Sequence, residues 1–188
     1  ALQNYKNGNC TEGAFFKVVD SNKVSSANSE VEKTFTDSLF LIESSYCISN
    51  VELQKAFDVY MSTDFRLDVM PRVTNVSVNN TGFCVSTEGI TGLILPAVQC
   101  SQTKIKQQEN VIIVHNTLDS VKTGPSYQPL YYREEIIVFA ELQNGVALYR
   151  GTFTRSEDIG VTSKYVLSNT VESSQNDIRD QYKEWLSR

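Results

Sequence analysis

The chain has 188 residues, a formal net charge of -5 and a pI near 5.0. Hydrophobic residues make up 40% and charged residues 21%, which is ordinary for a globular domain and excludes disordered, collagen-like and coiled-coil chains. No apolar run is long enough to cross a bilayer, and the acidic balance argues against a nucleic-acid partner. We expect one domain over residues 14–188, preceded by a flexible segment over residues 1–13.

Two helices are expected in the N-terminal half, after a short strand over residues 14–20. Ser29 and Glu32 match a capping box, and the apolar residues that follow recur at helical spacing, which predicts a helix over residues 29–43. A second helix is expected to begin after Asn50, whose side chain can cap it. The apolar stripe of this second helix consists of Leu53, Phe57, Tyr60 and Met61.

Strands are expected through the middle of the chain. Residues 65–69 alternate between apolar and charged side chains, which predicts a half-buried strand. The alternation changes phase near Pro71, so we expect a bend there before a strand that carries Val76 and Val78. A turn over residues 79–82 and a long loop over residues 120–130 separate further expected strands at residues 83–87, 93–95 and 111–114.

The pair Asn144-Gly145 predicts a tight hairpin, because these residue types best tolerate the positive φ angles of a type I′ turn. A two-residue loop at this position would place Leu142 opposite Ala147. The face that contains Ile136 would be wholly apolar, so we expect it to pack against helices, whereas the opposite face is mixed.

A last helix is expected over residues 170–186, with the tryptophan Trp185 as a packing anchor on its apolar stripe. Together these elements predict an α+β fold. It consists of a mainly antiparallel sheet on which two helices from the N-terminal half and the C-terminal helix pack.

The four cysteines are widely spaced, which does not suit a zinc site and favours disulfides in an oxidising compartment. Four cysteines allow three pairings. We favour Cys84 with Cys100, because two consecutive predicted strands carry them. The remaining pair, Cys10 and Cys47, would then join the N-terminal segment to the loop between the two helices. Four buried free thiols in a cytosolic protein are the alternative.

Three sequons, at Asn9, Asn75 and Asn79, make glycosylation possible in a secreted protein. Chance alone would place about as many sequons in a chain so rich in Asn, Ser and Thr. They therefore do not by themselves indicate a glycoprotein.

Catalytic constellations are weak in this sequence. The one histidine, His115, follows an apolar strand and has no nucleophile in a recognisable motif, so we expect no catalytic role for it. Glu134 and Glu135 are adjacent on a strand and would point to opposite faces. Asp64 and Asp68 could share a face, which leaves a hydrolase that uses acids alone as a minor alternative. We expect no cofactor and no metal.

A candidate interaction surface lies around the long loop, where Tyr127, Tyr131 and Tyr132 gather near two prolines. Tyrosine provides a large contact area at a small cost in side-chain entropy, so these residues could bind a protein. The alternative is that they only cover an edge of the sheet.

Residues 65–76 resemble the strand that follows the helices in small bacterial envelope lipoproteins, and residues 136–153 resemble their closing hairpin. These proteins include lipopolysaccharide-assembly lipoproteins and auxiliary lipoproteins of ABC transporters. The resemblance covers residues 60–78 and 133–186. It implies a non-catalytic accessory protein of the periplasm that docks on a larger transport or assembly complex.

We therefore expect a non-enzymatic binding or adaptor domain outside the cytoplasm, periplasmic or secreted, with a protein partner. Two alternatives remain open. One is a secreted viral or eukaryotic glycoprotein ectodomain that binds a host protein. The other is a carrier that holds an apolar ligand, such as a lipid, between the sheet and the helices.

Overall fold

A computed structural model describes residues 25–28, 31–35, 39–70, 72–89, 91, 95–122, 126, 132–155 and 177–188. In this part of the chain, all strands belong to one antiparallel sheet. The strands are β1 (Ser25–Asn28), β2 (Val31–Phe35), β3 (Leu39–Ser49), β4 (Val73–Val78), β5 (Gly82–Thr87), β6 (Ala97–Gln108), β7 (Val111–Val121), β8 (Tyr132–Leu142) and β9 (Gly145–Arg155).

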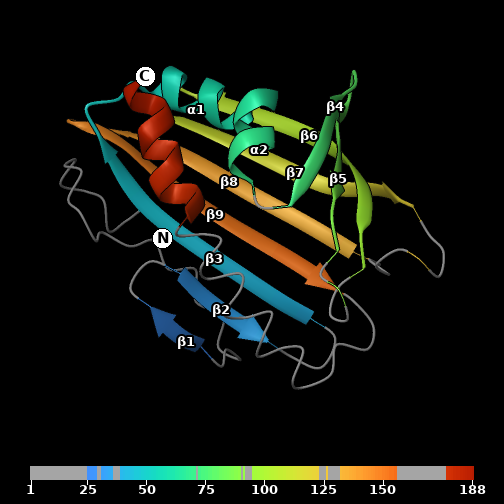
Figure 1. The fold of residues 1–188 in the computed structure, drawn as a ribbon. Helices are drawn as coiled ribbons and strands as arrows, with labels where there is room; N and C mark the ends of the chain where they lie inside the picture. The colour runs from blue at the N-terminus through green and yellow to red at the C-terminus, as the bar shows by residue number, and fades with distance from the viewer. Residues whose placement is uncertain are drawn as a thin grey trace.

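The spatial order of the strands is β1-β2-β3-β9-β8-β7-β6-β5-β4. The early strand β3 thus lies beside the last strand β9, with the β1–β2 hairpin on its other side. The helices α1 (Leu53–Met61) and α2 (Thr63–Val69) connect β3 to β4, and a C-terminal helix covers residues 177–187. Figure 1 shows all three helices on the same side of the sheet. The predicted α+β fold is confirmed.

The predicted helix over residues 29–43 is wrong, because residues 31–35 form β2 and residues 39–43 belong to β3. Their apolar spacing suits either structure over a short stretch. Pairing decides between the two: β3 pairs with β9 from Leu39 to Ser49 and with β2 on its other side. This long-range pairing gives the first half of β3 a neighbouring strand on both edges, and such tertiary contacts override a local helical spacing.

The predicted strand over residues 65–69 is also wrong, because these residues form α2. Ser62 caps this helix, since its hydroxyl oxygen accepts a hydrogen bond from the backbone N–H of Phe65 at 3.2 Å. Asp64 lies in the first turn, where a negative charge is favourable. The buried residues Phe65 and Val69 are four apart, which suits one face of a helix as well as it suits a strand.

Several predicted elements are confirmed. The second helix is α1, although Glu52 precedes its first residue and Asn50 does not cap it. The strands β4, β5 and β7 occur where the sequence predicts them. Other expectations fall outside the described residues, namely the segment 1–13, the strand over residues 14–20, residues 93–94 and most of the loop over residues 120–130.

The hairpin between β8 and β9 is present, but its turn lies one residue earlier than predicted. Leu142 pairs with Gly145 and Ala140 pairs with Ala147, so the turn consists of residues 143 and 144. Gly145 begins β9 against β3, and a Cβ atom built on it would lie 2.0 Å from the carbonyl oxygen of Ile48. The glycine is thus required by this close approach of two strands and not by a type I′ turn.

The predicted core face of this hairpin is the wrong one. Ile136, on the wholly apolar face, is 41% exposed, whereas Phe139, on the mixed face, is fully buried. The mixed face belongs to the core that includes α1 and the C-terminal helix. It also carries Glu135 and Arg150, which are buried as an ion pair. Because these two charges pair with each other, the helices can pack over a face that carries them.

The predicted disulfide between Cys84 and Cys100 is present and joins directly paired residues of β5 and β6. Cys47 is disulfide-bonded as well, but it lies in β3 and not between two helices. Cys10, its predicted partner, lies outside the described residues.

Replacing Cys84 and Cys100 together with alanine should destabilise the protein. The bridge closes a chain segment with a sequence separation of 16 residues, and opening a loop of this size costs about 3 kcal/mol through the entropy of the unfolded chain. Urea unfolding of the double variant, with the Cys47 bridge left intact, measures this loss. An unchanged midpoint would show that the bridge does not stabilise the fold.

Among the described residues, no helix is both long and apolar enough to cross a membrane.

Candidate functional site

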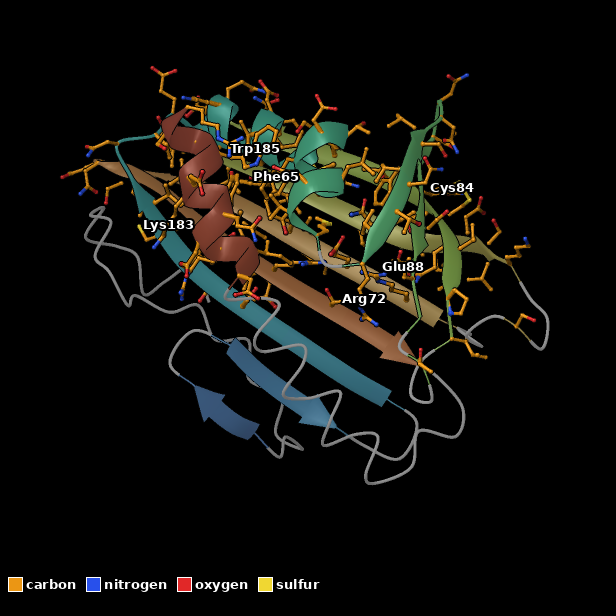
Figure 2. The ribbon with its side chains drawn as sticks, viewed as in Figure 1. Phe65, Arg72, Cys84, Glu88, Lys183 and Trp185 are labelled. Carbon is orange, nitrogen blue, oxygen red and sulfur yellow. A yellow bond between two sulfur atoms is a disulfide. The ribbon has the colours of Figure 1, made fainter. Side chains whose placement is uncertain are left out.

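An aromatic cluster lies between the helices and the sheet. Tyr60 of α1 lies 5.6 Å from the ring of Phe139 on β8 and 5.3 Å from the ring of Tyr182 on the C-terminal helix. Phe65 of α2 lies 5.2 Å from Tyr182 and 5.9 Å from Trp185, and Figure 2 shows Phe65 and Trp185 next to each other. Trp185 also donates to the carboxylate of Asp68 at 3.0 Å, so its predicted role as a packing anchor is confirmed.

A line of polar side chains crosses the helix-covered face of the sheet below this cluster. Glu135 of β8 accepts hydrogen bonds from Nε of Arg150 on β9 at 2.6 Å and from Nδ2 of Asn116 on β7 at 2.8 Å. Asn116 in turn accepts from the hydroxyl of Thr103 on β6 at 2.8 Å. Glu135, Arg150 and Asn116 are buried, so four adjacent strands place a hydrogen-bonded polar line inside the core.

The surroundings keep Glu135 ionised. Burial raises the pKa of its carboxyl, but the charges of Arg150 and Arg133, the hydrogen bond from Asn116 and the charge of Arg66 outweigh this and lower the pKa to about 2. Burial raises the pKa of Tyr60, so its hydroxyl is neutral at physiological pH. The line therefore contains a buried ion pair, Glu135 with Arg150, beside the neutral side chains of Asn116 and Thr103.

Two more arginines lie within electrostatic reach of Glu135. Arg133 of β8 donates from Nη1 to the side-chain oxygen of Gln99 at 2.8 Å. Arg66 of α2 is buried, and its Nη2 lies 3.2 Å from the sulfur of Met61. Burial is the main cause that lowers the pKa of both guanidinium groups, and the charge of Glu135 opposes that effect. Three arginines thus surround one carboxylate.

His115 does not take part in this arrangement. It lies on β7 between the helix-facing residues Val114 and Asn116, so it belongs to the other face of the sheet, where it contacts Glu134. Glu134 and Glu135 do point to opposite faces, as predicted. In the described part of the chain, no three His, Cys, Asp or Glu side chains are grouped so that they could hold a metal ion.

The acids Asp64 and Asp68 lie on α2, so they do not flank a strand. Asp68 is occupied by the hydrogen bond from Trp185. The structure does not bring either of them to the polar line on the sheet.

The structure describes only some of the residues of the predicted interaction surface and of the sequons. Tyr127, Tyr131 and Asn9 lie outside the described residues, and for Tyr132 only the backbone is described, as the first residue of β8. Asn75 is exposed on β4. Asn79 is exposed in the β4–β5 turn, where its side-chain oxygen accepts from the backbone N–H groups of residues 81 and 82. Their glycosylation stays a prediction.

Sequence reasoning missed the site itself. The signal was present in the hairpin: Glu135 shares a face with Ile137 and Phe139, and Arg150 shares one with Leu148. A charged residue among apolar neighbours on each of two paired strands indicates a buried pair. The prediction placed the wholly apolar face on the core and called this face only mixed, so the pair was not recognised.

No family model and no curated protein sequence matches this chain. Solved structures share its fold. One is a fragment of the STAR-related lipid transfer protein from Xanthomonas axonopodis, with a TM-score of 0.67 and 9% identity over 88% of this chain and 98% of that one. Another is the human StAR-related lipid transfer protein 5, with a TM-score of 0.62 and 15% identity over 89% of this chain and 88% of that one.

An enzyme has a similar structure as well. The Streptomyces aromatase/cyclase Zhui matches with a TM-score of 0.59 and 11% identity over 80% of this chain and 94% of that one. These findings overturn the predicted resemblance to envelope lipoproteins, since that resemblance rested on a strand at residues 65–69 that is in fact a helix. At such low identity the comparisons show the fold alone. This chain has the α+β fold of the STAR-related lipid transfer domains and of the aromatase/cyclases.

Proposed function

We propose that this protein binds a largely apolar small molecule between its helices and its sheet and acts as a carrier for it. The observation that supports this most is the polar line of Thr103, Asn116, Glu135 and Arg150 beneath a cluster of aromatic rings. Ligand sites for small molecules are mainly apolar, with a few placed polar groups that fix the orientation of the ligand. Lipid transfer proteins with this fold make a lipid a reasonable ligand.

A carrier fits the described residues better than an enzyme does. Glu135 has a pKa lowered to about 2 and already accepts two hydrogen bonds, so it is a poor general base or acid near neutral pH. His115 lies on the opposite face of the sheet. The carrier alternative also has more support than the adaptor role with a protein partner. A location outside the cytoplasm stays part of the proposal and is supported by the Cys84–Cys100 disulfide.

Native mass spectrometry tests the proposal with dodecanol kept below its solubility limit and with dodecanoate and dodecyl phosphate kept below their micelle concentrations. We expect one molecule of at least one of these ligands bound per chain and a rise in the melting temperature of the folded protein. The same chain unfolded in urea serves as the control for non-specific association. If no ligand binds, no lipid co-purifies and the melting temperature does not change, the carrier function is wrong.

A further inference from the structure

Arg66 is a buried cation that contacts an aromatic ring and a thioether sulfur. The residue is 4% exposed, and it extends from α2 toward the sheet, where its guanidinium carbon lies 4.0 Å from the centre of the Phe83 ring on β5. Its Nη2 contacts the sulfur of Met61. In the described part of the chain, no carboxylate forms an ion pair with it. Burying a charge in such surroundings is costly unless a counter-ion or hydrogen bonds compensate it.

Unsatisfied donors in the described residues are concentrated around α2. The two buried side-chain nitrogen or oxygen atoms without a hydrogen-bond partner are Nε of Arg66 and Nη1 of Arg72. Arg72 lies three residues after the last residue of α2 and has a positive φ of 64°, and its carbonyl oxygen accepts from the backbone N–H of Glu88 at 2.8 Å. Figure 2 shows Arg72 and Glu88 near each other below α2. Native proteins leave few buried donors unpaired, so these two donors, one on α2 and one shortly after it, require an explanation.

The charged groups around Arg66 also leave room for an additional negative charge. Glu135 is engaged with Arg150 and Asn116, and Arg133 donates to the neutral Gln99. The charges of Arg150 and Arg133 act against the positive charge of Arg66. One carboxylate therefore faces three guanidinium groups, and the helix-covered interior carries an excess of positive charge among the described residues.

We propose that the ligand is an amphiphile whose apolar body ends in one anionic group, a carboxylate or a phosphate monoester, and that Arg66 binds this group. The proposal rests on the carrier function and specifies its ligand class. The free Nε of Arg66 would donate to the anion, and Arg133 would add positive charge from β8. The fork of a guanidinium matches carboxylate and phosphate oxygens, and such hydrogen bonds are strong in a site that excludes water. The apolar body would lie along the aromatic cluster around Phe65 and Tyr60.

Comparison of three ligands with the same tail tests this assignment. The wild-type chain should bind dodecanoate or dodecyl phosphate about 10- to 100-fold more tightly than dodecanol, because a hydrogen bond to a charged group contributes about that factor. The two anionic ligands distinguish a carboxylate from a phosphate. In Arg66→Met this preference should fall to nearly one. Arg66→Lys should retain part of the preference.

Lys106→Met is the matched control, because it removes one positive charge from an exposed position of β6 and should leave the preference intact. If the wild-type chain binds dodecanol as tightly as the anions, the anion site is wrong while the carrier function stands. A preference that persists in Arg66→Met would also overturn it. Should Arg66→Met fail to fold, the wild-type preference and Arg66→Lys decide the question. Failure of all three ligands to bind would instead contradict the carrier function.

Discussion

Replacement of Glu135 with alanine is expected to lower the free energy of unfolding by about 3–5 kcal/mol, the usual cost of removing one partner of a buried ion pair. The carboxylate accepts hydrogen bonds from Arg150 and Asn116, and the truncation would leave both donors buried without it. Arg150 would then be a buried cation that has lost its carboxylate partner. Urea unfolding followed by circular dichroism measures the loss.

Two controls separate this effect from a general loss of stability. Glu109→Ala removes an exposed acid at the β6–β7 turn and should change the unfolding free energy by less than about 0.5 kcal/mol. The double variant Glu135→Met with Arg150→Met removes both charges and should recover much of the loss. A double variant as unstable as Glu135→Ala would show that loss of the polar line, and not the unpaired charge, causes the decrease in the free energy of unfolding.

The same carboxylate gives the stability a pH dependence. Its pKa is lowered from 4.5 to about 2 in the folded chain, so the unfolded chain takes up the proton first as the pH falls. The stabilisation from Glu135 is therefore complete above about pH 4.5 and is lost as the pH falls toward 2. Glu135→Gln should flatten this part of the stability profile. An unchanged acid profile would contradict the ionised state of Glu135.

Replacement of Phe65 with alanine is expected to cost about 3–5 kcal/mol, because it would leave a large cavity in the core. Phe65 is fully buried and contacts the rings of Tyr60, Tyr182 and Trp185, so it joins α1, α2 and the C-terminal helix. Leu67→Ala on the same helix is the matched control, since Leu67 is 41% exposed. Equal losses in the two variants would show that α2 does not pack as described.

The fold class could be predicted from the sequence, but the assignment of short segments could not. Residues 65–69 alternate as a strand would, yet the cap from Ser62 and the docking of Phe65 in the core make them a helix. Residues 39–43 have helical spacing, yet their pairing partner on β9 lies more than a hundred residues away. Local patterns cannot report a partner so distant in sequence, and they are ambiguous over one or two turns.

The candidate site was harder to predict because it depends on which face of the sheet is covered. A wholly apolar face is the simpler choice for the core, and the helices pack on the other one. Glu135 and Arg150 can be recognised as an ion pair only when it is known that their strands are paired in this register. Arg66 could not be found from the sequence, since on a strand it would have pointed to solvent, whereas on α2 it points into the core.

The β1–β2 hairpin has a consequence for how this protein can be handled. It pairs with the first half of β3, from Phe40 to Ser44, and so prevents that stretch from becoming an outer strand with free backbone donors and acceptors. Exposed edge strands of this kind pair with strands of other molecules. Among the described strands, the two edge strands are β1 and β4, which are shorter than β3. Shortened versions of the protein that lack the hairpin would therefore be prone to self-association, and expression designs should retain it.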